Sequence, residues 1–203
     1  MATSLQRRSI RLKDYDYSQS GAYFVTICTY RQSCLFGVVA AGQVRLNEYG
    51  RIAHTEWLKS AEIRQEIALD VFVVMPNHIH GIVWITSPDR SIGNVRTHAR
   101  KGDRPVALTP PRGPAPKSLG AFLAGYKSAV TKQINQVRDS PGTPVWQRNY
   151  YEHIIRTERA LAAIRQYIAQ NPLRWELDRY NPATTGPDPQ ARELWNLLQP
   201  DTT

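Results

Sequence analysis

The chain has 203 residues, a length typical of one domain or of one domain with appendages. Hydrophobic residues make up 41% of it and charged residues 21%, which excludes a disordered chain and permits a core without disulfide bonds. Its 26 Lys and Arg exceed its 17 Asp and Glu, and the net charge of +9 favours polyanionic partners, nucleic acid before anionic membrane. The two cysteines, Cys28 and Cys34, exclude a disulfide framework and an all-cysteine zinc site.

No segment of the sequence is typical of secretion or of membrane insertion. The N-terminal residues are charged and lack the apolar stretch of a secretory signal. The longest apolar runs, at 71–75 and 81–85, are far too short to cross a bilayer. We therefore expect a cytoplasmic, nucleoid-associated protein with reduced thiols and no membrane partner.

The first half of the chain predicts a strand, a hairpin and a helix. Residues 22–30 are rich in β-branched and aromatic side chains, which favour a strand. Residues 35–46 predict a hairpin that turns at Ala41-Gly42, because glycine accepts a positive φ. Asn47 is placed to cap a helix over 48–66.

Two further strands are predicted at 68–75 and 78–86. Both are rich in Val, Ile and Phe, and Pro76-Asn77 between them suits a tight reversal. Residues 87–116 then combine many prolines with basic residues and show neither a helical nor a strand period. We expect this segment to be an exposed, mobile loop.

The clearest helix is predicted over 117–138. Its apolar residues fall on one stripe at about 100° per residue, and basic and polar residues lie opposite. The stripe consists of Leu119, Phe122, Leu123, Tyr126, Val130, Ile134 and Val137.

A strand and a helix are predicted near the end of the chain. Residues 145–156 favour a strand, and Thr157 is placed to cap a helix that runs to residue 170. The tail, 177–203, is rich in proline, and its apolar patch at 194–198 can dock on the body of the protein.

This order of elements predicts an α+β fold of the ferredoxin-like, split βαβ kind, with one extra helix at the C-terminal end. An antiparallel sheet with helices on one face would leave its other face free for a partner. We expect one domain over 1–176, which contains the 87–116 loop, followed by the tail.

Two of the five histidines, His78 and His80, flank Ile79 in a predicted strand. Residues two apart on a strand point to the same face, so the two imidazoles would project together and form half of a metal site. An isolated His-x-His is more often a surface or hydrogen-bonded pair. In a central strand, however, buried polar side chains need a partner, which favours a metal site.

Tyr167 and Asn171 are four residues apart and would share one helix face, one turn from each other. Asn171 supplies an amide oxygen suited to Mg²⁺ or Mn²⁺, and Tyr167 a hydroxyl that could attack, although most tyrosines only pack. Tyr151 is the second candidate nucleophile. His153, on the same strand face as Tyr151, would either support the metal site or contact DNA.

Three segments in this order carry a family resemblance: VVMPNHIHGIVWI, VWQRNYYEHIIR and IRQYIAQNPLRW. Together with RRSIRLKDYDYSQSGAYFVTICTYR and LNEYGRIAHTEW, they resemble the REP-associated tyrosine transposases, which belong to the HUH single-tyrosine nucleases. The similarity covers residues 7–176 apart from the 87–116 loop.

The resemblance implies an HUH fold in which His78 and His80 hold a divalent metal, Mg²⁺ or Mn²⁺. It also implies that Tyr167 is the nucleophile, that Asn171 is the third ligand and that the extra C-terminal helix carries the tyrosine. Members of the family cleave and rejoin single-stranded DNA at hairpins formed by repetitive extragenic palindromes. The implied enzyme is a transposase or single-strand endonuclease-ligase that forms a 5′-phosphotyrosine, as a monomer or homodimer.

Basic residues gather in two parts of the sequence, an arm at 7–13 and a strip at 104–138 that contains no Asp or Glu. Both could follow a phosphate backbone, although surface Lys and Arg are common. Tyr15, Tyr17 and Tyr23 could stack on unpaired bases or pack in the core. The candidate nucleic-acid contacts are Arg7, Arg8, Arg11, Lys127, Lys132 and Arg148.

Two other functions fit the sequence. A non-cleaving DNA- or RNA-binding regulator would keep the fold and the basic residues, but it would not need His78, His80 and Tyr167 together. A replication-initiator nuclease would use the same chemistry on a different substrate. Acyl transfer and NTP hydrolysis have no supporting motif in the sequence.

Overall fold

The computed structural model describes residues 15–86 and 113–199. The basic arm at 7–13, most of the 87–116 loop and His98 therefore lie outside the described residues. No helix in the described ranges is both long enough and apolar enough to cross a membrane.

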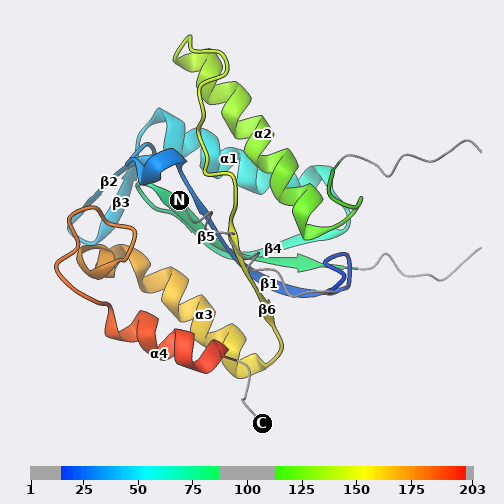
Figure 1. Ribbon diagram of the computed structural model, residues 1–203, viewed down its shortest axis with the longest axis vertical. Helices are drawn as coiled ribbons and strands as arrows, with labels where there is room; N and C mark the ends of the chain where they lie inside the picture. The colour runs from blue at the N-terminus through cyan, green and yellow to red at the C-terminus, as the bar shows by residue number, and fades with distance from the viewer. Residues whose placement is uncertain (1–14, 87–112, 200–203) are drawn as a thin grey trace, which may run out of the picture.

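A four-stranded antiparallel sheet forms the centre of the fold, with strand order β4-β5-β1-β6 (Figure 1). Its strands are β1 (Gly21–Cys28), β4 (Ile67–Val74), β5 (His78–Ile85) and β6 (Tyr151–Ile155). This arrangement has the two central strands β1 and β5 side by side, as in ferredoxin-like folds. The predicted α+β class and ferredoxin-like order are confirmed.

Helices cover both faces of this sheet (Figure 1). On one face lie α1 (Glu48–Ile63) and α2 (Leu119–Val137), and on the other lie α3 (Glu158–Gln170) and α4 (Pro189–Leu198). The expectation that the second face stays free for a partner is wrong. The apolar stripe of α3 packs onto it, and α4 docks through the predicted patch in the tail.

Side-chain caps start three of the helices, two of them at Asn47 and Thr157 as the sequence predicts. Asn47, Ser118 and Thr157 each accept a hydrogen bond from the backbone N–H three residues later. The hairpin also turns where expected, between β2 (Gly37–Ala40) and β3 (Gln43–Leu46). Its two turn residues both have positive φ, as a two-residue hairpin turn requires.

The last strand is shorter than the sequence predicts. The expected strand at 145–156 becomes β6 only from Tyr151, because residues 145–150 pass the end of β1 instead of pairing regularly with it. A single bridge joins Thr29 to Trp146, and the backbone N–H of Gln147 donates to the carbonyl of Cys28 at 2.9 Å. Two 3₁₀ helices, η1 (Tyr30–Gln32) and η2 (Asn171–Leu177), complete the elements.

An ion pair fastens α3 to the edge strand β4. Asp70 lies at an irregularity in the β4–β5 pairing and accepts three hydrogen bonds from the guanidinium of Arg165 on α3. The indole N–H of Trp84 donates to the same carboxylate at 3.1 Å. The hydrogen bonds from Arg165 lower the pKa of Asp70 to about 2, because they stabilise its charged form.

We predict that Asp70→Asn lowers the free energy of unfolding at pH 7 by about 1 kcal/mol, a value reduced for the exposure of Arg165. A carboxylate with a lowered pKa stabilises the folded state above its unfolded pKa, and the stabilisation is lost as the pH falls. In the parent protein the stabilisation from Asp70 should disappear between about pH 4 and pH 2. The Asp70→Asn variant should show no such loss of stability over this range.

Urea unfolding across this pH range measures the effect. The control is Asp139→Asn, at an exposed residue with positive φ that asparagine also tolerates. Equal acid sensitivity of the two variants would contradict the role given to Asp70.

Candidate functional site

His78 and His80 lie on β5 and point to the same face of the sheet, as the alternation of strand side chains predicts. Their ring centroids are 4.5 Å apart, and both side chains are fully buried. Ile79 lies in the opposite core beside Trp57. Gly81 permits this packing, because a Cβ at that position would come within 2.6 Å of the Trp57 ring.

Asn77 fixes the tautomer of His78. Its Nδ2 donates to the carbonyls of Gln32 and Tyr180, at 2.9 and 2.6 Å, which identifies its Oδ1 as the atom 2.9 Å from His78 Nδ1. An amide oxygen can only accept, so Nδ1 of His78 is the protonated nitrogen. The lone pair of Nε2 therefore points away from Asn77, toward Asp178.

His80 is held between two hydroxyl groups. Thr26, its partner across β1, lies 2.8 Å from Nδ1, and the Tyr167 hydroxyl lies 3.4 Å from Nε2. With Nδ1 donating to Thr26, Nε2 is left to accept from Tyr167. Both histidines thus turn Nε2 toward the C-terminal part of the chain.

Burial keeps both imidazoles neutral. It lowers the pKa of His78 to about 3, an effect that the neighbouring Asn171 side chain partly opposes. The pKa of His80 is also well below its usual value, first because of burial and then because of the adjacent His78. A neutral imidazole is the form that binds a metal ion, so no proton has to be displaced from Nε2.

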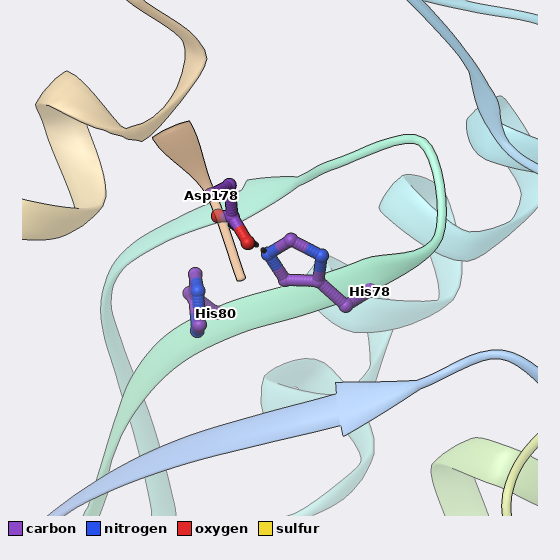
Figure 2. Close-up of side chains that lie close together, drawn as sticks. All are labelled: His78, His80 and Asp178. Atoms are coloured by element: carbon purple, nitrogen blue, oxygen red, sulfur yellow. Dashed lines mark ion pairs between the residues drawn. The ribbon is translucent and has the colours of Figure 1, made fainter. Parts of the chain in front are cut away.

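Asp178 completes a compact group with the two histidines, as Figure 2 shows. One ligand atom from each residue lies within 4.8 Å of the others, and Asp178 Oδ2 is 3.7 Å from His78 Nε2. Asn171 reaches the same carboxylate, to which its Nδ2 donates at 3.0 Å. The structure therefore brings the predicted residues together with a carboxylate that sequence reasoning missed.

The donor set fits a divalent cation. Among the described residues, the buried His78 Nε2 and Asn171 Oδ1 have no hydrogen-bond partner, although buried polar atoms normally have one. Two neutral imidazoles, one carboxylate and one amide oxygen also form a ligand set suited to such an ion. No sequence spacing ties Asp178 to the histidines, and it lies just beyond the domain expected to end at 176.

Tyr167 lies on α3 with only 3% of its surface exposed, and Asn171 follows one turn later, as predicted. Burial raises the pKa of Tyr167 far above its usual value, and the charge of Asp178 adds to the effect. The charge of Arg179 partly opposes both effects. The hydroxyl is therefore protonated in this closed arrangement.

A short segment after η2 covers the site. The ring of Tyr180 lies 4.7 Å from that of His78, and its backbone carbonyl is held by Asn77. Arg179 lies over the Tyr180 ring on the outer side, with its guanidinium carbon 5.4 Å from the ring centroid. Neither Asp178 nor this cover could be found from motifs, because both depend on how the chain turns back after η2.

Tyr151 lies farther from the histidines than Tyr167. It is in register with Thr26 of β1, which pairs with His80 on its other side, so two strand spacings of about 10 Å separate Tyr151 from His80. Its ring packs against Phe24 and Trp195. His153, two residues on, is half-buried in register with Phe24.

The remaining candidates lie away from the histidines. Tyr23 is fully buried, and Tyr15 and Tyr17 pack against the same core, which favours packing over base stacking. His54 on α1 is half-buried against Phe72 instead of facing solvent. The basic candidates Lys127, Lys132 and Arg148 line one groove beside α2, whereas Arg7, Arg8 and Arg11 lie outside the described residues.

We predict that Asn77→Ala lowers the free energy of unfolding by about 2–3 kcal/mol, because it leaves His78 Nδ1 and two carbonyls without their buried partner. Denaturant unfolding measures the loss. The matched control is Asn149→Ala at an exposed residue. A loss no larger than that of the control would mean that Asn77 does not anchor the site.

Comparisons with known proteins agree with this fold. No model of a known protein family matches the chain. A Haemophilus influenzae protein described as uncharacterized is 38% identical over 173 residues, which cover 85% of this chain and 92% of that protein. The solved structure of a REP-associated tyrosine transposase bound to a REP hairpin has a TM-score of 0.50 at 18% identity, over 83% of this chain and 74% of the other. A candidate transposase from Deinococcus radiodurans gives 0.42 at 15% identity, over 79% and 96%. The chain belongs to the same family as the Haemophilus influenzae protein, and it has the HUH fold of the REP-associated tyrosine transposase.

Proposed function

We propose that this protein is a metal-dependent enzyme that cleaves and rejoins single-stranded DNA at palindromic hairpins, with Tyr167 as its nucleophile. The observation that carries the proposal is the distance of 3.4 Å between the Tyr167 hydroxyl and Nε2 of His80, inside a group that fits a cation. The shared fold with a transposase bound to a REP hairpin and the net charge of +9 support a DNA substrate.

His78, His80 and Asp178 would hold the metal, with Asn171 as a further oxygen donor. A bound Mg²⁺ or Mn²⁺ would supply positive charge to a non-bridging oxygen of the scissile phosphate. Asn77 and Thr26 would orient the two histidine ligands, because their contacts with the Nδ1 atoms keep each Nε2 turned toward the site.

Tyr167 would form the covalent link. Its hydroxyl oxygen bonds to phosphorus, the bond from phosphorus to the 3′ oxygen breaks, and the phenol proton ends overall on the released 3′-hydroxyl. The product is a 5′-phosphotyrosine that keeps a phosphodiester, so a second 3′-hydroxyl can reverse the step and rejoin strands without ATP.

A phosphate can reach this chemistry only after the cover moves, because His78, His80 and Tyr167 are buried. The cover contacts the site through Tyr180, whose ring lies 4.7 Å from that of His78 and whose carbonyl accepts from Asn77. Movement of Tyr180 would open a path to the histidines while Asp178 stays beside them.

We predict that the wild-type protein forms a covalent adduct with a labelled DNA hairpin flanked by single strand, in Mg²⁺ or Mn²⁺, and that Tyr167→Phe abolishes it. The phenylalanine keeps the ring and removes only the attacking oxygen. Denaturing gel electrophoresis detects the adduct. Tyr151→Phe is the matched control, since Tyr151 lies on the same face about two strand spacings from His80.

The opposite pattern, an adduct retained in Tyr167→Phe and lost in Tyr151→Phe, would overturn the assignment. Tight DNA binding without an adduct in either metal would instead identify a non-cleaving regulator.

We also predict that His78→Ala weakens Mn²⁺ binding at least tenfold, because it removes an imidazole whose Nε2 has no other partner. Calorimetric titration measures the affinity, and circular dichroism confirms that the variant is folded. His54→Ala, which removes a histidine packed on Phe72, serves as the control. Comparing Asp178→Ala with Asn171→Ala then shows whether the carboxylate contributes more than the amide; unchanged affinity in His78→Ala would exclude this centre.

A further inference from the structure

A basic groove runs beside α2, on the face of the sheet opposite to α3. It has a volume of about 510 Å³, and its walls are α2 and the segment 142–148. A second, smaller hollow continues it toward the start of α2 and shares Lys127 and Arg148 with it. From Lys132 back to Gly120, the two hollows follow α2 for about 18 Å at 1.5 Å per residue. We call this continuous surface the α2 groove.

Cations and neutral donors line part of the α2 groove, beside apolar residues such as Pro144 and Trp146. Lys127, Lys132 and Arg148 contribute positive charge, and no Asp or Glu lines either hollow. Hydroxyl and amide groups from Ser128, Thr131 and other residues lie between the charges. Such a lining suits the phosphates of a nucleic-acid backbone, which accept hydrogen bonds and repel carboxylates.

The side chain of Lys127 is held in the wall of the groove and does not project freely into it. Its Nζ donates to the carbonyls of Gln147 and Arg148, at 2.5 and 3.2 Å. The indole N–H of Trp146 donates in return to the carbonyl of Lys127. These contacts fix the segment 142–148 against α2 and leave Lys132 and Arg148 as the exposed charges.

The groove passes the end of β1, the strand that pairs with the histidine strand β5. Gln147 is hydrogen-bonded to Cys28 at the end of β1, and Cys28 is in register with His78 on the other side. Two strand spacings, about 10 Å, therefore separate the floor of the groove from His78.

We propose that the α2 groove binds the backbone of the single-stranded DNA that flanks the cleaved position. This inference rests on the proposed function, because a DNA strand cleaved at the histidine site would have to pass the end of β1. Lys132 and Arg148 would each contact a phosphate, and the groove would thereby hold the strand on the opposite side of the sheet from Tyr167.

The test measures binding of a fluorescent single-stranded oligonucleotide as a function of salt, in the Tyr167→Phe protein so that cleavage cannot contribute. Each lost phosphate contact should make the slope of log K against log salt about 0.7 shallower and weaken binding about fivefold at 0.1 M salt. Lys132→Gln and Arg148→Gln should each show this change. Arg192→Gln, which removes an exposed charge on α4, should leave the slope unchanged.

The outcomes separate this inference from the proposed function. Slopes for Lys132→Gln and Arg148→Gln that match that of Arg192→Gln would contradict DNA binding by the α2 groove, even if Tyr167 forms an adduct. Shallower slopes in a protein that never forms an adduct would support DNA binding by the α2 groove and contradict the proposed cleavage. Tighter binding of an RNA of the same sequence would overturn the assignment to DNA.

Discussion

Two neutral imidazoles buried in the central strand β5 impose the constraint on which the rest of the structure depends. A polar group without a partner in a protein interior costs several kcal/mol, so the surrounding elements have to supply partners. Asn77 supplies one from the turn before β5, Thr26 one from β1, and Tyr167 one from α3. The ion pair between Asp70 and Arg165 also joins α3, which carries Tyr167, to β4.

The two faces of the sheet differ in composition. The face under α1 and α2 is a continuous apolar core, in which Trp57 packs so closely on β5 that only glycine fits at position 81. This core sets the backbone of the histidine strand. The face under α3 carries the polar groups and the segment that covers them, so that segment can change without loss of the core.

Local patterns in the sequence predict most of the fold and every residue of the candidate group except Asp178. The period of two that aligns His78 with His80, and the four-residue spacing of Tyr167 and Asn171, both follow from short-range geometry. Asp178 does not, because its place depends on an irregular turn after η2 that long-range contacts hold, among them the pairing of Arg174 with Asp188. Similarly, the period of α3 predicts an apolar stripe but not which face of the sheet it covers.

Two of the three hydrogen bonds of Asn77 do not involve the cover, and they would remain if the cover moved. One amide hydrogen is bound to Tyr180 in the cover, but the other is bound to Gln32 in η1, which does not belong to it. Movement of Tyr180 would free one N–H and leave the amide oriented, with its oxygen still accepting from His78. The imidazole would then keep its proton on Nδ1, and its lone pair would need no rearrangement to bind a metal ion.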